Sequence, residues 1–186
     1  LPVMYSGRIS EDDTLKVTFK ETIPESWWSS RKTTFTFPEG VKVIDVDFSK
    51  TEYTTGLNYD QSYVDEGNIT VEDNVMTWKN ITVANNQKAK IEMKFTLAIA
   101  PDFEGDITCT VGGAGVTDET TVTVAKAVAP IKVTADTNKV KIDYRNVAVS
   151  DITITEVEDG VLESGDVLTL EVDNMTFDST PKYEII

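Results

Sequence analysis

Lys88-Ala89-Lys90-Ile91-Glu92-Met93-Lys94-Phe95-Thr96-Leu97-Ala98-Ile99-Ala100 is the stretch of sequence that decides the fold. Its large apolar residues occupy every second position from Ile91 to Ile99, and mostly polar residues lie between them. A period of two places one set of side chains in a core and the other in water, as in a β-strand. Pro101 ends the pattern because proline has no N–H to donate to a sheet. The stretch therefore predicts a long, half-buried strand.

Alternating segments with turn residues between them lie on both sides of this strand, and no segment shows a sustained helical period. Short strands at regular spacing predict an all-β fold, here an immunoglobulin-like antiparallel β-sandwich with a second, smaller β module. The apolar phase slips at Ile44, which predicts a β-bulge or a strand that changes sheets. The expected strands span residues 4–9, 15–20, 33–37, 41–48, 69–71, 75–78, 106–111, 120–124, 131–135, 140–144, 151–156, 166–172 and 175–177.

Residues 125–130 mark a domain boundary. Pro130 restricts the conformation of Ala129 and ends any ladder there, so this segment is predicted to be a connector. A chain of 186 residues has room for one large domain or two modest ones, and the connector favours two. We expect a β-sandwich domain over residues 1–128 and a second β-sandwich repeat, which need not be complete, over residues 129–186.

An internal repeat is the basis for the second module. Residues 16–21 and 151–156 share one pattern, and at the same offset residues 34–37 align with residues 169–172. After one gap, Val41 and Val43 align with Met175 and Phe177. If the repeat holds, the second module lacks counterparts of the strands that begin at residue 88.

Acidic residues dominate the charge of the chain. It contains 32 Asp and Glu against 17 Lys and Arg, so the formal net charge is −15. Such a surface repels phosphate backbones and anionic lipids, and we expect no binding of nucleic acid. No apolar run approaches the length of a membrane span, so we expect no membrane insertion. The sequence starts at Leu1 with neither an initiating Met nor a signal peptide, which indicates a processed or excised segment.

The chain contains few of the residue types that commonly act in catalysis. The chain has one cysteine and no histidine, so a catalytic thiol would have no histidine to activate it. Cys109 occupies an apolar position of its strand and is expected to be a small buried side chain. Paired carboxylates are the only acid and base left for glycoside hydrolysis, and no sequence signal places two of them at catalytic separation. We expect no enzyme, and a carboxylate hydrolase is the third alternative.

Several patches resemble a known group of proteins. Residues 151–156 followed by residues 166–172, together with residues 101–108 and 129–133, are similar to repeat modules of large exported proteins from clostridia and related anaerobes. Many of those proteins are labelled copper amine oxidase-like or stalk-domain proteins. The resemblance implies an extracellular, cell-wall-associated β protein built from repeats. It implies no amine oxidase activity, because the chain has no histidine to ligate copper.

Aromatic residues in polar surroundings form the first candidate site. Flat aromatic faces bind sugars, although neighbouring strand residues point to opposite faces, which would place one of the two adjacent tryptophans in the core. The stretch of residues 49–67 has no clear period, and long loops of this kind are often functional. The candidate ligand-binding residues are Trp27, Trp28, Tyr53, Tyr59 and Tyr63, with Trp78 beside them.

Carboxylates at a turn form the second candidate site. Calcium takes several hard oxygen ligands on a flexible loop, and Asp102, Glu104 and Asp106 supply them at alternate positions. The spacing differs from that of the EF-hand loop, and a solvated acidic turn is the alternative. Calcium is the one cofactor that the sequence suggests.

Taken together, these features predict a non-catalytic extracellular module, structural or adhesive, of a bacterial cell-surface or secreted protein. A Gram-positive source fits, because extracellular chains of these bacteria often do without cysteine. The expected partners are cell-wall or extracellular polysaccharide, or neighbouring domains of the same chain. The alternative is a carbohydrate-binding β-sandwich module that uses exposed Trp and Tyr side chains.

Overall fold

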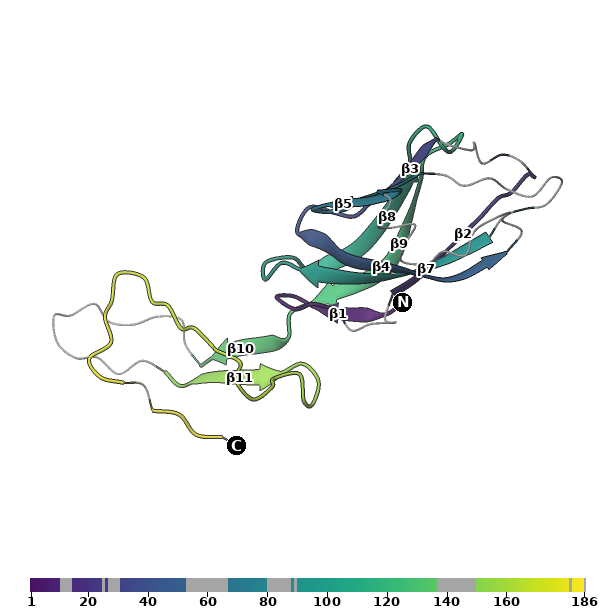
Figure 1. Ribbon diagram of the computed structural model, residues 1–186. Coiled ribbons are helices and arrows are strands. Elements are labelled where there is room, and N and C mark those ends of the chain that lie inside the picture. The colour runs from purple at the N-terminus through teal and green to yellow at the C-terminus, as the bar shows by residue number, and fades with distance from the viewer. Residues whose placement is uncertain are drawn as a thin grey trace. The chain divides into compact units, whose positions relative to one another are not determined.

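The computed structural model describes residues 1–10, 15–24, 26, 31–52, 67–79, 88, 90–136, 150–180 and 182–185. These residues form β-strands, turns and irregular segments, and none of them lies in a helix (Figure 1). The chain divides into two units, unit 1 from Leu1 to Ala129 and unit 2 from Pro130 to Ile186. Within the described residues, the expected all-β class is confirmed.

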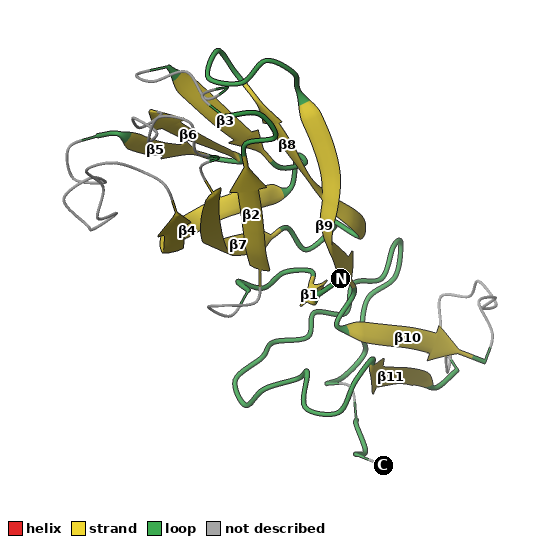
Figure 2. Ribbon diagram, turned by 90° about the vertical axis from the view of Figure 1, so that its right-hand side faces the viewer, coloured by secondary structure: helices red, strands yellow, loops and turns green. Residues whose placement is uncertain are grey.

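Unit 1 is a β-sandwich of two sheets (Figure 2). One sheet has six strands in the order β1-β9-β8-β3-β6-β5, and the other has three in the order β2-β7-β4. The strands are β1 (Val3–Tyr5), β2 (Leu15–Lys20), β3 (Lys32–Thr36), β4 (Val41–Glu52), β5 (Ile69–Glu72), β6 (Val75–Lys79), β7 (Lys90–Ile99), β8 (Gly105–Gly112) and β9 (Thr120–Val128).

Strand β7 is the centre of the three-stranded sheet and confirms the strand predicted for residues 88–100. Its residues alternate between buried and half-buried positions along the whole strand. It pairs antiparallel with β2 and β4, so that Phe95 lies opposite Leu15 on one side and opposite Val46 on the other. Its apolar face packs against the other sheet, which explains why this face is almost fully removed from water.

Aromatic rings from both sheets meet in the core of unit 1. Phe95 of β7 lies 5.2 Å from Phe37 and 6.1 Å from Phe35 between ring centroids, and Phe35 lies 5.9 Å from Phe19 of β2. The contacts are tilted or edge-to-face, which is the arrangement that the ring quadrupoles favour. These contacts join the two layers, because β3 carries Phe35 in one sheet and β2 and β7 belong to the other.

Strand β4 contains the irregularity that its sequence predicts. Its register against β7 shifts between Val43 and Asp45, and Ile44 at the shift is 51% exposed. A second shift lies between Phe48 and Lys50. The bulge explains the change of apolar phase and confirms that expectation, because an extra residue moves every later side chain to the other face.

The last strand of unit 1 corrects the expected connector. Residues 125–128 are not a connector, because β9 continues to Val128, and Ala125 and Ala127 are buried in the core. Lys126, Ala127 and Val128 pair with β1 in a parallel ladder, whereas the other strand pairs of unit 1 are antiparallel. Small alanine side chains and the nearby Pro130 conceal the strand in the sequence. Its partner is remote in the sequence and gives no local signal.

Unit 2 contains an antiparallel pair formed by β10 (Ile131–Ala135) and β11 (Ile152–Glu156). Both strands were expected. The strands expected at residues 166–172 and 175–177 are absent, and these residues are irregular, with Leu170 and Phe177 exposed. Strands form only when a neighbour accepts their hydrogen bonds, and the described part of unit 2 offers these segments none. The strand expected at residues 140–144 lies outside the described residues.

Candidate functional site

The ends of many strands gather at one end of unit 1, which we call the loop end. Register places Lys20 and Glu52 opposite Lys90, and Lys32 opposite Lys79. The end of β8 and the start of β9 lie there too, since Val111 pairs with Thr120. The loop end therefore carries the β2–β3, β4–β5, β6–β7 and β8–β9 connections, and loops on a rigid sandwich are common places for binding residues.

The aromatic candidate residues belong to these connections. Trp27 and Trp28 fall in the β2–β3 connection, and Tyr53, Tyr59 and Tyr63 fall in the β4–β5 connection. All five lie outside the described residues, so sugar binding through them stays a prediction. Trp78 is different, because it lies in β6 and is 0% exposed. Trp78 is therefore a core residue, and its expected place beside a sugar is wrong.

A recess of about 280 Å³ opens at the loop end between β2 and the β8–β9 connection. Its wall includes Phe19 of β2 and Glu21 just after this strand, and Val116 and Asp118 from the connection. The Glu21 side chain is only 5% exposed, which is rare for a carboxylate. Most of the lining residues are polar or charged, and their carboxylate, hydroxyl and ammonium groups offer hydrogen bonds to a polar ligand.

Sequence reasoning missed Glu21 as a buried acid, although a signal was present. Leu15, Val17 and Phe19 face the core at alternate positions of β2, and position 21 continues the same phase. A period of two therefore aims Glu21 inward beyond the end of the strand. The charge of the residue conceals this, because glutamate is almost never fully buried unless it has a partner.

Glu156 stands at the end of β11 and shows what a carboxylate in this position does. Its Oε1 accepts the backbone N–H of Leu162 at 2.6 Å, and its Oε2 accepts that of Gly160 at 3.3 Å. The side chain thus holds the turn that follows the strand. Glu21 follows the end of β2 as Glu156 stands at the end of β11, so a role in holding the turn after its strand is the structural alternative to ligand binding for Glu21.

The acidic turn before β8 places its carboxylates outward. Phe103 packs against the core, and Asp102, Glu104 and Asp106 are exposed. Asp106 lies opposite Lys126 of β9 in the register, which gives it a nearby cation. Within the described ranges, no three His, Cys, Asp or Glu side chains are grouped closely enough to hold a metal ion. The calcium site at these three residues stays a prediction.

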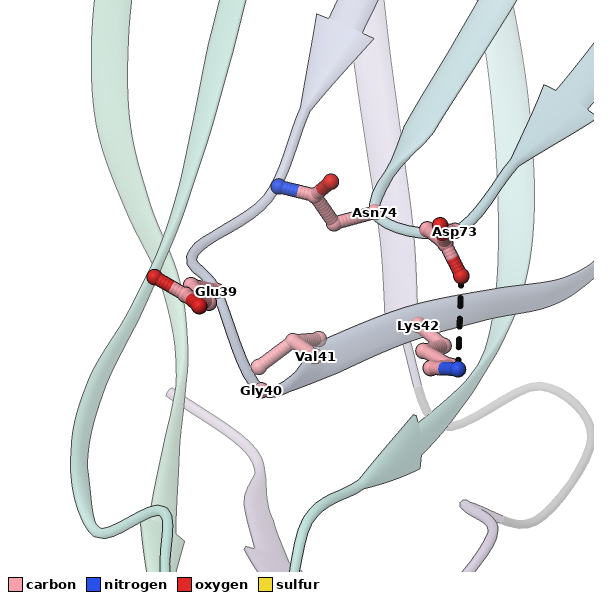
Figure 3. Close-up of a pocket in the computed structure, with 6 residues that line it drawn as sticks. All are labelled: Glu39, Gly40, Val41, Lys42, Asp73 and Asn74. Carbon is pink, nitrogen blue, oxygen red and sulfur yellow. Dashed lines mark ion pairs between the residues drawn. The ribbon is translucent and has the colours of Figure 1, made fainter.

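A second recess, of about 530 Å³, lies where the β3–β4 and β5–β6 turns meet (Figure 3). The Lys42 ammonium lies 3.3 Å from the Asp73 carboxylate, and Figure 3 shows Glu39 pointing away from this pair. Asn74 donates from Nδ2 to the carbonyl of Phe37 at 2.6 Å and accepts the N–H of Phe37 at 2.9 Å. These bonds join the two turns. The recess is therefore the space left between two turns that meet at this corner of the sandwich.

The single cysteine is a core residue, as expected. Cys109 lies in β8 and is 0% exposed. Burial raises the pKa of its thiol from the ordinary value of 9.0 to about 12, because a buried thiolate loses its hydration. The thiol is therefore protonated near neutral pH and is a poor nucleophile.

The described residues contain no helix of the length and apolar character needed to cross a membrane. Comparison with models of protein families found no match for this chain. Comparisons with curated proteins and with solved structures found no match either. Any functional assignment therefore depends on the loop end, the two recesses and the order of the units along the chain.

Proposed function

We propose that the chain is a non-catalytic structural and adhesive module of a bacterial cell-surface or secreted protein. The observation that carries the proposal is the direct succession of two β units. Strand β9 of unit 1 ends at Val128 and β10 of unit 2 begins at Ile131, so Ala129 and Pro130 alone separate them. The link has two residues, and one of them is a proline, whose backbone is restricted. Units joined by so short a link suit a chain that spaces or presents other domains.

The surface chemistry supports the same role. A net charge of −15 keeps a module soluble at high local density. The only thiol is buried and protonated, so it resists oxidation outside the cell.

Retention on purified Gram-positive cell walls tests this proposal. The whole chain is mixed with insoluble walls and with a panel of chromogenic glycosides at the same concentration. We expect sedimentation with the walls and no release of chromophore. Chromophore release that disappears when a pair of carboxylates is replaced by amides would make the chain a hydrolase and overturn the proposal.

A carbohydrate-binding module is the second candidate, and the convergence of strand ends at the loop end favours it. Two connections that carry the aromatic residues start and finish at this end. For this role, soluble polysaccharide should change the tryptophan fluorescence, and replacing Trp27 and Trp28 by alanine should abolish retention. Tyr183→Ala is the matched control, because Tyr183 is an aromatic residue 89% exposed in unit 2. Retention that survives the double tryptophan replacement would favour the structural module over the carbohydrate-binding one.

A further inference from the structure

The chain enters and leaves unit 1 through two strands that lie side by side and run in the same direction. Val3, Met4 and Tyr5 of β1 pair with Lys126, Ala127 and Val128 of β9 in parallel register. The chain enters β1 beside Lys126 and leaves β9 beside Tyr5, at the opposite end of the ladder. Tension on the two ends of unit 1 therefore pulls these strands along their lengths in opposite senses.

This direction of pull determines how the ladder fails. Ladder hydrogen bonds run across the strands, so tension along the strands loads all of them together. Bonds that share the load must break almost at once for the strands to separate. In an antiparallel pair pulled from its open end, the bonds are loaded and broken one after another. For the same number of bonds, the sheared pair resists a higher force.

Contacts beyond the ladder hold β1 in place. At its two ends, the N–H of Lys126 donates to Pro2 at 3.0 Å, and the N–H of Ser6 donates to Val128 at 2.9 Å. The Ser6 hydroxyl is buried, and its one proton is shared between the carbonyls of Phe103 at 2.5 Å and of Val128 at 3.2 Å. The side chain of Met4 is 3% exposed and belongs to the core cluster. Pulling β1 along β9 therefore also exposes a buried apolar side chain and a buried hydroxyl.

The segment after β1 is fixed to the other sheet. Gly7 donates to the carbonyl of Ile99 at 2.9 Å, and the N–H of Ile99 donates to Arg8 at 2.9 Å. Ser10 donates to Leu97 at 2.7 Å, and its Oγ accepts the N–H of Leu97 at 2.9 Å. Residues 2–10 thus bridge both layers of the sandwich, so once β1 separates from β9 the load passes to the few bonds that residues 7–10 make with β7.

Unit 2 contains the opposite geometry and serves as an internal comparison. Its strands β10 and β11 are antiparallel, with Ile131 opposite Glu156. The chain enters β10 and leaves β11 at this same end, so tension opens the pair one bond at a time. One chain therefore contains a sheared pair in unit 1 and an unzipped pair in unit 2.

We infer that unit 1 is built to bear tension along the chain, and that the β1–β9 pair is the part that resists it. The inference rests on the proposed function, because a module that links a surface to another domain is pulled through its two ends. It adds a mechanical role to that function and names the strands that perform it.

Single-molecule force spectroscopy of the whole chain, held at Leu1 and Ile186, tests the inference. We expect unit 2 to extend at low force without a distinct rupture, and unit 1 to rupture in one step at a force several-fold higher. The step should release roughly 400 Å of chain at about 3.3–3.6 Å per extended residue. Rupture of unit 1 at the low force of unit 2 would overturn the inference.

The direction of pull provides a test that leaves β1 untouched. A handle on Glu104→Cys, which is an exposed position just before β8, and a second handle after Val128 load the β8–β9 pair from its open end, where Gly105 lies opposite Ala127. The native Cys109 is buried and does not compete for the handle. We expect rupture at a clearly lower force than in the end-to-end pull. Equal forces in the two directions would contradict a role for the β1–β9 pair.

Two proline variants locate the resistance within β1. The alternation of the ladder directs the N–H of Met4 toward β9 and that of Val3 away from it, so Met4→Pro removes a ladder donor and Val3→Pro does not. We expect the rupture force to fall for Met4→Pro and to stay near that of the parent for Val3→Pro. If Met4→Pro does not fold, the Ser6→Ala variant is measured instead. This change removes only the buried hydroxyl that contacts the carbonyl of Val128 just after β1.

The result of the force experiment can be told apart from the result of the cell-wall experiment that tests the proposed function. Low rupture force with normal retention on cell walls would remove the mechanical role and leave the adhesive one. High rupture force in a chain that releases glycoside products would remove the proposed function and keep the mechanical property of the fold.

Discussion

The backbone N–H of Ser6 donates to the carbonyl of Val128 at 2.9 Å, so the first turn of unit 1 is bonded to the last residue of its last strand. The bond lies at the point where the chain leaves the sandwich for Pro130. It closes unit 1 within its own residues, because both partners belong to the span from Leu1 to Ala129. We therefore expect unit 1 to fold without unit 2.

Unit 1 expressed alone as residues 1–129 should unfold with the stability that it has in the whole chain. All three tryptophans, Trp27, Trp28 and Trp78, lie in unit 1, so tryptophan fluorescence in a guanidinium titration follows this unit by itself. Residues 130–186 alone should show no cooperative transition by circular dichroism, because the described part of this unit has one two-stranded pair and leaves Leu170, Phe177 and Ile185 exposed, which is marginal in water. A cooperative transition in the isolated residues 130–186 would contradict this assignment.

Phe35→Ala should destabilise unit 1 by about 3–5 kcal/mol, because it removes a fully buried ring that contacts Phe19 and Phe95. The measurement is the free energy of unfolding from denaturant titration. Phe177→Ala is the matched control, since the same ring is deleted from a position that is 49% exposed in unit 2. We expect the control to change the stability of unit 1 by less than about 0.5 kcal/mol. Equal effects of the two variants would mean that Phe35 is not at the centre of the core.

Gly113→Ala should destabilise unit 1 by roughly 2–5 kcal/mol through strain and overpacking. Gly113 has φ of +91°, and an added Cβ would lie 2.8 Å from the carbonyl oxygen of Lys32. Gly105→Ala separates the two causes, because Gly105 also has a positive φ, of +117°, but an added Cβ meets nothing within 4 Å. The difference between the variants in thermal unfolding measures the clash. A larger effect at Gly105 than at Gly113 would refute the close approach of the β8–β9 connection to β3.

The Cys109 thiol should stay unreactive toward a thiol-specific reagent at pH 8 and react at the ordinary rate once guanidinium unfolds unit 1. Burial raises its pKa from 9.0 to about 12 in the folded state, so the folded protein keeps the proton at pH values where the unfolded chain loses it. This contribution to stability is fully present below pH 9 and is lost as the pH rises from about 9 to about 12. Cys109→Ala should remove that part of the pH dependence. Rapid labelling of the folded protein at pH 8 would show that the strand is open to solvent.

Local periodicity predicts the strands of unit 1 best where one face is buried. The alternation in β7 locates that strand to within a few residues, and the phase change at Ile44 locates the bulge of β4. Both signals are short in range, because each depends on which face of one strand meets the core. The hairpin of β5 and β6 around Asp73 is equally local.

Pairing between remote strands is what the sequence does not reveal. The last part of β9 reads as a linker because Ala125 and Ala127 are small and its partner is β1, which lies far away in the chain. Residues 166–177 have the opposite property, since their apolar alternation is clear but no described neighbour pairs with them. A strand requires a partner as well as a pattern.

The residues of the candidate site also divide into those that a local pattern predicts and those that depend on contacts between remote segments. Residue type alone does not tell whether Trp78 is buried, because a tryptophan suits a core as well as a binding face. Its position in β6 decides between the two. Glu21 was open to prediction from the phase of β2, but its charge argued against burial. The convergence of the connections at the loop end depends on strand register, which no single segment of sequence contains.

Antibody labelling of the cells that naturally express this chain tests the central claim, that it is a module of the cell surface or the extracellular space. An antibody raised against unit 1 is applied to intact cells, to lysed cells and to the cell-free medium. We expect signal on intact cells or in the medium before any lysis. Signal that appears only after lysis would contradict it.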